Sequence, residues 1–412
     1  MKPTRSFFVL GALLSLTIAV GGCKATPDTA AAATAGEAPM FEVDPFWPKP
    51  LPNHWLQGAT IGVAVDSRDH VWIVHRNTPD QFAARTEIGL AQDPPLSECC
   101  QPAPPVLEFD PDGNLVGSWG GPPDSGEYDW PLSNHGIEVD NMDNVWIGGN
   151  GRTDSHVLKF ARDGTFLMQI GRAGARVTGT SPEGREIVER NSMDMESFGQ
   201  VAKVSFDASA NEIYVADGYL NKRIVVIDAN TGDFIRYWGA YGKPPNDEEA
   251  AAMGRYSPDD PPAPQFRGPV HCAEPSNDGL VFVCDRAADR IQVFQLDGTY
   301  VSEVFIAPLT LSQGSTWDIA FSPDAEQRFI YLADGQNMKV YVIERESMEV
   351  LYSFGDGGRQ PGLFFAVHSI ATDSEGNIYT TETYEGKRVQ KFLYRGMDEV
   401  TAENIGAPWP SN

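Results

Sequence analysis

Basic residues and long apolar stretches are scarce in this sequence. It has 31 lysine and arginine residues against 57 aspartate and glutamate residues, which gives a formal net charge of −26, and it has no basic cluster. Proteins that bind nucleic acid concentrate positive charge on one surface, so we expect no nucleic acid partner. The longest apolar stretch, from Phe7 to Val20, is about 14 residues long and too short to span a bilayer comfortably as a helix.

This apolar stretch has the features of an export signal. Lys2 and Arg5 precede it, and small residues lead directly into Cys23. The arrangement resembles a bacterial lipobox, which predicts cleavage before Cys23 and a lipid on its sulfur; ordinary signal cleavage nearby is the alternative. We therefore expect a lipoprotein signal peptide over residues 1–22 and a flexible tether over residues 23–40. The protein would be lipid-anchored in the bacterial cell envelope, facing the periplasm or the cell surface, on the outer membrane rather than the inner.

Cysteine is also rare, with four residues besides Cys23. In an oxidising compartment cysteines can pair. Cys272 and Cys284 lie at opposed positions of a predicted hairpin, so they can form a disulfide across adjacent strands, with free buried thiols as the alternative. Cys99 and Cys100 lie in a proline-rich loop, and we assign them no function.

Histidine occurs only 7 times, yet three of these residues share one position in a repeated pattern. Each of the three begins a short alternating strand, and a second strand follows after a turn rich in Asp, Asn and Gly. Three other segments show the same pattern without histidine. The shared position is occupied, in chain order, by Ile61, His135, Ala202, His271, Trp317 and His368.

These six repeats predict an all-β fold, an NHL-type six-bladed β-propeller with four antiparallel strands per blade. The last repeat lacks a good fourth strand, so we expect an N-terminal strand near residues 41–46 to complete the last blade. The propeller would span residues 41–400, followed by a C-terminal tail at 401–412. Three long insertions fall on the face where the first strands begin. They cover residues 77–104, 172–196 and 240–266.

If the first strand of each blade lies nearest the axis, the three histidines point towards one centre. Three neutral imidazoles leave an open coordination position, as catalytic zinc sites do, although other divalent metals suit these ligands nearly as well. The alternative is three buried histidines with satisfied hydrogen bonds. The other four histidines lack the pattern and are expected to make local hydrogen bonds: His54, His70, His75 and His156.

Polar residues also follow the second strands on the same face. Alignment of repeats one, three and four places Arg76, Gly218 and Arg286 at one position, with Tyr219 next to Gly218. Arginine binds carboxylates through two parallel hydrogen bonds, and a phenol beside a cation can act as a base. These residues predict an anion-binding site around an open metal, with ordinary loop residues as the alternative.

Two acid–base pairs recur in equivalent places. Asp217 is followed by Arg223, and Asp285 is followed by Arg290. We interpret them as structural ion pairs between adjacent strands rather than as catalytic groups.

Taken together, these residues resemble NHL-repeat propellers, and within them the catalytic core of peptidyl-α-hydroxyglycine α-amidating lyase. The resemblance runs from about Gly62 to Phe392. It rests on the segments Gly62-Val63-Ala64-Val65-Asp66 with His75-Arg76, Asn134-His135-Gly136-Ile137, Ala216-Asp217-Gly218-Tyr219 with Arg223-Ile224-Val225, Pro269-Val270-His271, Asp285-Arg286 with Arg290-Ile291-Gln292, and Val367-His368-Ser369.

The resemblance implies a reaction in which a carbinolamide C–N bond is cleaved to release an amide and glyoxylate. The substrate would be a small anionic or peptide-derived molecule. Alternatives are a zinc-dependent hydrolase or lactonase on the same site, and a non-enzymatic scaffold in the cell envelope. The roles implied are zinc ligands for His135, His271 and His368, a catalytic base for Tyr219, and active-site arginines for Arg76 and Arg286.

The resemblance also implies a structural calcium ion. Its ligands would include the backbone oxygens of Val63 and Ile137 and an aspartate after the third histidine, but Ser369 stands in the place of that aspartate. Ala366 and Leu220 likewise replace a methionine and a disulfide cysteine of the family pattern.

Overall fold

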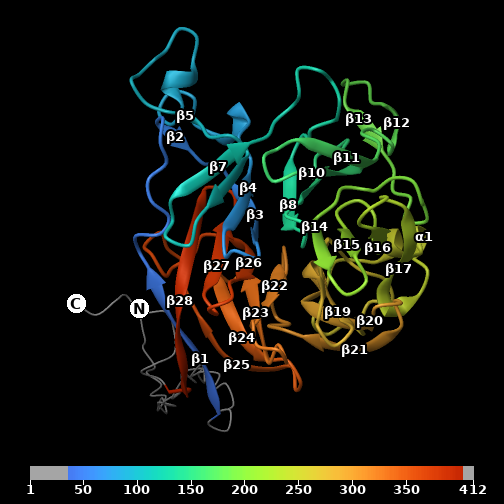
Figure 1. Ribbon diagram of the computed structural model, residues 1–412. Coiled ribbons are helices and arrows are strands. Elements are labelled where there is room, and N and C mark those ends of the chain that lie inside the picture. Colours follow the sequence, from blue (N-terminus) through green and yellow to red (C-terminus); the bar gives the residue numbers. More distant parts are fainter. Residues whose placement is uncertain (1–35, 402–412) are drawn as a thin grey trace, which may run out of the picture. The chain divides into compact units, whose positions relative to one another are not determined.

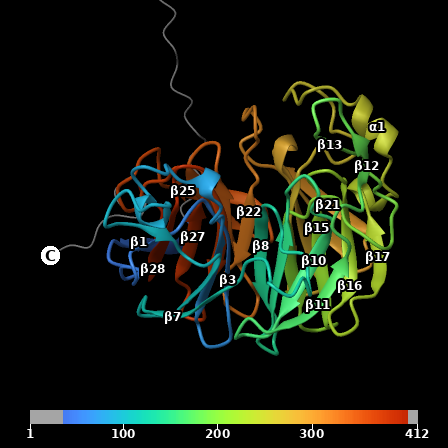
Figure 2. The same cartoon turned by 90° about the horizontal axis from the view of Figure 1, so that it is seen from above.

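The computed structural model describes residues 36–401. Six four-stranded antiparallel sheets surround one axis as the blades of a β-propeller (Figures 1 and 2). The first strands of neighbouring blades contact one another around the ring, so these strands are the innermost. The predicted fold class, blade number and strand order are confirmed.

The blades follow the chain in order, and each runs from its inner to its outer strand. Blades 1 to 3 consist of β3 (Thr60–Val65), β4 (Val71–His75), β6 (Val106–Phe109) and β7 (Leu115–Trp119); β8 (Asn134–Val139), β9 (Val145–Gly149), β10 (His156–Phe160) and β11 (Phe166–Gly171); and β14 (Lys203–Asp207), β15 (Glu212–Asp217), β16 (Arg223–Asp228) and β17 (Phe234–Trp238). Blades 4 to 6 consist of β18 (Val270–Pro275), β19 (Leu280–Asp285), β20 (Arg290–Gln295) and β21 (Tyr300–Phe305); β22 (Asp318–Phe321), β23 (Phe329–Asp334), β24 (Lys339–Glu344) and β25 (Glu349–Phe354); and β26 (Val367–Thr372), β27 (Ile378–Glu382), β28 (Arg388–Glu399) and β1 (Glu37–Asp44).

A carboxylate builds the first turn in blades 1, 2 and 6. In blade 2 the Asp140 side chain accepts hydrogen bonds from the backbone amides of Met142 and Asn144 and from the Trp146 indole at 3.0 Å. An aspartate that bonds the amides ahead of it closes a turn without help from the sheet. The same arrangement joins Asp66 to Trp72 at 3.1 Å and Asp373 to Tyr379 at 2.9 Å. This explains why, in these three blades, aspartate follows the first strand and an aromatic residue lies in the second.

Apolar side chains fill the space between neighbouring blades. Trp146 of blade 2 is fully buried among Val204, Ile213 and Val215 of blade 3. Trp238 of blade 3 packs in the same way against Phe294 of blade 4, with ring centroids 5.8 Å apart. Because each blade has apolar residues on both faces, a blade is stable only between two others.

The N-terminal strand β1 completes blade 6. It pairs with β28 in antiparallel register from Glu37 to Asp44, as predicted. The strand starts at Glu37, so residues 37–40 belong to the propeller and not to the tether that the sequence suggested. The predicted signal peptide at 1–22, its lipidation site Cys23 and residues 402–412 of the predicted tail lie outside the described residues.

The three insertions contain regular structure that the sequence pattern did not predict. The first has two short 3₁₀ helices, η1 (Pro79–Gln81) and η2 (Gly89–Ala91), and a strand pair, β5 (Gln101–Pro102) with β2 (Trp55–Leu56). The second is a hairpin of β12 (Val177–Thr180) and β13 (Glu186–Val188), and the third holds η3 (Ala240–Gly242) and α1 (Asp247–Ala252). Figure 2 shows the hairpin and α1 at the same end of the blades. Between residues 36 and 401, no helix has the length and apolar character needed to span a bilayer.

Both remaining cysteine pairs are bonded. Cys272 and Cys284 face each other on β18 and β19 and form the predicted cross-strand disulfide. Cys99 and Cys100 also form a disulfide, within the first insertion.

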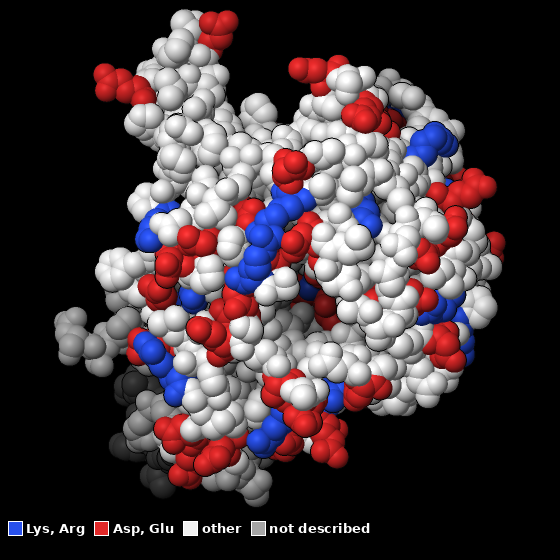
Figure 3. All heavy atoms as spheres, viewed as in Figure 1, with Lys and Arg blue, Asp and Glu red and all other residues white. Residues whose placement is uncertain are grey.

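Charged side chains of both signs are mixed over the surface drawn in Figure 3. Several pair between blades, as the exposed Arg68 of blade 1 does with Asp143 of blade 2 at 2.7 Å. Exposed pairs of this kind contribute little to stability, so packing between blades dominates.

Substitution of Phe41 tests the closure by β1. Phe41 is 2% exposed, and its ring centroid lies 5.3 Å from that of Tyr331 in blade 5. Phe41→Ala should therefore lower the free energy of unfolding by about 3–5 kcal/mol in a denaturant titration. Phe46→Ala is the matched control, because Phe46 is 85% exposed and its loss should change stability by less than about 0.5 kcal/mol. Equal effects of the two substitutions would contradict this account.

Candidate metal centre

The three patterned histidines lie on the innermost strands of alternate blades. His135 is on β8, His271 on β18 and His368 on β26. In all three strands the pairing with the next strand slips at or beside the histidine. Such a β-bulge turns a side chain out of the regular alternation. Here it directs each imidazole towards the axis.

The imidazoles converge on one point. One ring nitrogen of each lies within 4.8 Å of those of the others. The ring centroids are 5.2, 4.8 and 4.9 Å apart, and the residues are 1%, 2% and 4% exposed. The sequence pattern thus predicted correctly which histidines come together.

Each imidazole is fixed by a backbone carbonyl of the following blade. The Nδ1 atom of His135 is 2.5 Å from the oxygen of Ala202, that of His271 is 2.5 Å from the oxygen of Trp317, and that of His368 is 2.6 Å from the oxygen of Ile61. Only a protonated Nδ1 can donate to a carbonyl, so the lone pair is on Nε2. The non-histidine residues of the repeat therefore orient the histidines.

Glycine permits this close approach in blade 2. Gly136 has a φ of 76°, and a Cβ atom there would lie 2.9 Å from the oxygen of Ala202. That oxygen is the acceptor of the His135 bond. A larger residue at 136 would push blades 2 and 3 apart.

Electrostatics keeps the three imidazoles neutral. Burial lowers the pKa of His135 and His271 well below 6.5, and nearby positive charge, including the Arg286 guanidinium, lowers both further. Burial, followed by Arg286 and Arg76, lowers the pKa of His368 to about 3. Neutral imidazole is the form that binds metal.

The donor set fits a divalent metal. Three neutral nitrogens with fixed tautomers converge, and each Nδ1–H bonds a carbonyl, the arrangement that orients histidine ligands in metalloproteins. With three protein ligands, one coordination position stays free for another molecule. His135, His271 and His368 can therefore hold one ion.

Tyr219 lies directly beside this centre. Its hydroxyl is 2.9 Å from Nε2 of His135 and 3.1 Å from Nε2 of His271. The backbone that carries it is fixed by Lys222, whose Nζ donates to the carbonyls of Gly218 at 3.0 Å and Tyr219 at 3.3 Å. The phenol is thus held at the metal-binding face of the imidazoles.

Arg286 reaches the same point from blade 4. One guanidinium nitrogen donates to the Tyr219 hydroxyl at 3.3 Å, and the guanidinium stacks over the Trp317 ring at 4.4 Å. Its Nε donates to the carbonyl of Gln313 at 3.1 Å, and the side-chain oxygen of Gln313 accepts from Tyr384 at 3.0 Å. These contacts hold the Arg286 guanidinium in a fixed orientation at the mouth of the site.

Arg76 is the second cation near the histidines. It donates to Asn150 at 3.0 Å, while its Nε is buried without a hydrogen-bond partner among the described residues. Burial lowers the pKa of Arg76, and Tyr219 makes the largest electrostatic contribution opposing that shift. A buried guanidinium with free donors suits an anion.

The sequence missed the residues that hold these arginines. Asn150 follows the second strand of blade 2 at the repeat position of Arg76 and Arg286, and Tyr384 follows that of blade 6 at the repeat position of Tyr219. Gln313 lies in the connection from blade 4 to blade 5 and has no repeat position. Trp317 was noted only as a member of the repeat, although it supplies both a carbonyl to His271 and a surface to Arg286. For Trp317, the repeat position was the only feature of the sequence that indicated a place near the centre.

The other predicted polar residues are structural. The Asp217–Arg223 pair, at 2.8 Å, and the Asp285–Arg290 pair, at 3.0 Å, are fully buried between adjacent strands, as expected. His75 does not reach the centre, because its Nδ1 accepts from the Gly58 amide and its Nε2 lies 2.9 Å from the oxygen of Pro104.

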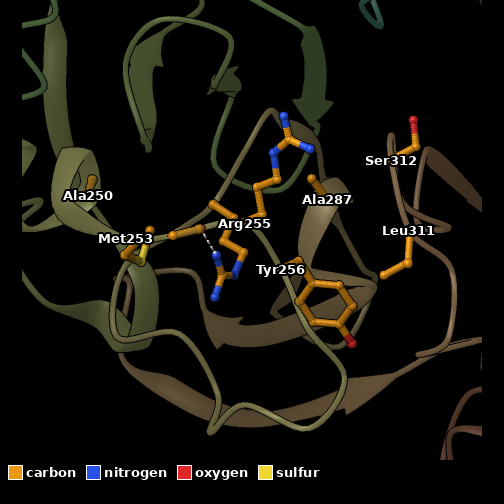
Figure 4. Close-up of a pocket in the computed structure, with 9 residues that line it drawn as sticks. Ala250, Met253, Arg255, Tyr256, Ala287, Leu311 and Ser312 are labelled. Atoms are coloured by element: carbon orange, nitrogen blue, oxygen red, sulfur yellow. Dashed lines mark hydrogen bonds between the residues drawn. The ribbon is translucent and has the colours of Figure 1, made fainter.

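A side pocket of about 550 Å³ borders the mouth (Figure 4). Ala287 in its wall follows Arg286, and Ser312 precedes Gln313, which bonds Arg286. In Figure 4 Met253 and Leu311 lie on opposite sides of the pocket, with Tyr256 between them.

The groups beneath the histidines do not suit calcium. The proposed ligands Val63 and Ile137 belong to β3 and β8, and Gly136 and Ser369 line one small cavity with Lys203 and Asp318. An ammonium group in that space repels a divalent cation, and the Ser369 hydroxyl donates to Asp318 at 2.5 Å.

No protein-family model matches the sequence. Peptidyl-glycine alpha-amidating monooxygenase of Mus musculus is 26% identical over 345 residues, which are 80% of this chain and 30% of that protein. Peptidyl-alpha-hydroxyglycine alpha-amidating lyase 1 of Drosophila melanogaster is 25% identical over 85% of this chain and 59% of that protein. NHL repeat-containing protein 3 of Mus musculus is 25% identical over 87% and 85% of the two chains.

The chain is a six-bladed β-propeller whose sequence is similar to amidating lyases and to an NHL repeat-containing protein. It spans 30% and 32% of the length of two mammalian monooxygenases that it matches. A solved structure of a Bacteroides thetaiotaomicron protein of unknown function has a TM-score of 0.50 and 15% identity, covering 87% of this chain and 77% of that one; it shows the fold alone.

Removal of one imidazole tests whether the three histidines bind a metal ion. His271→Ala leaves two ligands, so protein dialysed after exposure to zinc should lose most of its bound metal, measured by inductively coupled plasma mass spectrometry. His54→Ala is the control, because His54 is exposed and does not belong to the group of three histidines. Equal metal content in the two variants would rule out a three-histidine site.

Proposed function

We propose that the protein is a zinc-dependent lyase that cleaves a carbinolamide C–N bond and releases an amide and glyoxylate. One observation carries this proposal: the Tyr219 hydroxyl lies 2.9 and 3.1 Å from two histidine Nε2 atoms and 3.3 Å from Arg286. A base, metal ligands and a carboxylate-binding group are thus within one small space. The similarity to amidating lyases supports the same reaction class.

The substrate would carry a carboxylate next to the carbon that bears both the hydroxyl and the amide nitrogen. Arg286 and Arg76 provide planar donors for that carboxylate. The side pocket beside Ala287 offers space for the acyl group on the amide nitrogen. These contacts orient the reacting carbon towards Tyr219.

Tyr219 would remove the proton of the substrate hydroxyl. The oxygen electrons then form the aldehyde carbonyl of glyoxylate, the C–N bond breaks, and the nitrogen takes a proton to give the primary amide. A bound zinc ion supplies Lewis acidity that stabilises negative charge on substrate oxygen.

Replacement of the Tyr219 hydroxyl tests the assignment of the base. With α-hydroxyhippurate as substrate, Tyr219→Phe should lower the rate of glyoxylate release by about 10²–10⁴-fold, because proton transfer is lost. Metal content should stay unchanged. Tyr300→Phe is the control, since Tyr300 lies on the outer strand β21.

The same assay separates the lyase from its alternatives. A zinc-loaded wild type that releases no glyoxylate would end the lyase proposal. Hydrolysis of ester or lactone substrates by that protein would then indicate a hydrolase, and a metal-free wild type would indicate a binding scaffold.

Arginine geometry gives an independent test. Arg286→Lys keeps the charge but removes the planar fork and the stacking on Trp317. The KM for α-hydroxyhippurate should rise about 10-fold or more, with a smaller change in kcat. Arg328→Lys, at a side chain that is 54% exposed, should leave KM unchanged. A lysine variant with wild-type KM would show that Arg286 does not bind the carboxylate.

A further inference from the structure

A cluster of buried charged residues lies on the innermost strands, next to the three histidines. Lys203, which follows the Ala202 carbonyl, is 7% exposed. Its Nζ is 2.7 Å from Oδ1 of Asp318 and 2.7 Å from Oε1 of Glu274. A cavity of about 10 Å³, roughly the space of one water molecule, is lined by the three histidines together with Lys203 and Asp318.

The cluster joins four blades. Lys203 belongs to blade 3, Glu274 to blade 4 and Asp318 to blade 5. On blade 6, the Ser369 hydroxyl and the Ile370 amide donate to Oδ2 of Asp318 at 2.5 and 3.1 Å. One ammonium group therefore sits at the meeting point of neighbouring inner strands.

Carboxyl groups outnumber ammonium groups around Lys203. Glu138 of blade 2 also faces it, and burial, reinforced by Glu274, raises the pKa of Glu138 to about 8. Although burial opposes its charge, Asp318 and Glu274 raise the pKa of Lys203. Without Lys203, the carboxylates of Asp318 and Glu274 would lose the ammonium group that pairs with both of them.

We propose that the Lys203 ammonium is a built-in structural cation that takes the place of a bound divalent ion at the axis. The family resemblance implies calcium here, but this chain has Ser369 in place of the aspartate ligand and an ammonium between the remaining carboxylates. A covalently attached cation cannot dissociate, so the blades stay connected without calcium.

Removal of the ammonium should make the protein dependent on calcium. Breaking a buried ion pair from one side is strongly destabilising, so Lys203→Met should lower Tm by roughly 5–10 °C. Millimolar calcium chloride should raise the Tm of this variant by several degrees, because hard divalent cations bind clustered carboxylates. The wild type should retain no calcium after dialysis and show no shift, and magnesium chloride serves as the ion control.

Lys159→Met is the matched variant. Lys159 is equally buried, but its Nζ donates to the Ala229 carbonyl on the outer part of blades 2 and 3, away from the axis. It should lose stability without gaining a calcium response. A calcium-stabilised wild type, or a Lys203→Met variant indifferent to calcium, would overturn the proposal.

A double variant covers the case in which Lys203→Met does not fold. Lys203→Met with Asp318→Asn removes one charge of each sign and should fold with little calcium response. If the double variant also fails to fold, charge balance is not the role of Lys203. Because calcium content and Tm are the readouts, failure here is distinct from failure of the proposed lyase activity.

Discussion

The structure depends on a hydrogen bond repeated three times around the axis, from a histidine Nδ1 to the carbonyl oxygen of the next blade. His135, His271 and His368 donate, and the residues at the same repeat position of the intervening blades accept. The geometry of a metal held by the three Nε2 atoms is therefore set by how far adjacent blades are rotated and spaced. Any change that shifts one inner strand moves a ligand and a carbonyl together.

Charge is distributed unevenly between the surface and the centre. The chain carries a net charge of −26, whereas the charged groups that lower the pKa of the imidazoles include the guanidinium groups of Arg76 and Arg286. In the poorly hydrated centre these charges act strongly, while acidic groups on the surface are screened by salt. The positive charge of the two guanidinium groups therefore acts mainly within the last few ångströms of the centre and is affected little by the acidic exterior.

The sequence allowed much of the fold and the centre to be predicted, because both are repeated. The alternation of histidine with Ile61, Ala202 and Trp317 identified the axis. The opposed positions of Cys272 and Cys284 in a predicted hairpin indicated their disulfide. Partners that come from distant, unrepeated segments were not predictable. Lys203 and Asp318 are separated by 115 residues, and neither neighbourhood indicates the other. The insertions lacked clear periodicity, so their hairpin and helix were missed.

The shared last blade also determines the order in which the protein can be assembled. β1 is made early but finds its partner β28 only when nearly the whole chain exists, and His368 lies on the same late blade. An incomplete chain has at most two of the three imidazoles and an open ring. The complete set of three imidazoles therefore exists only in finished molecules, and truncated products keep an unpaired strand edge that is open to proteolysis.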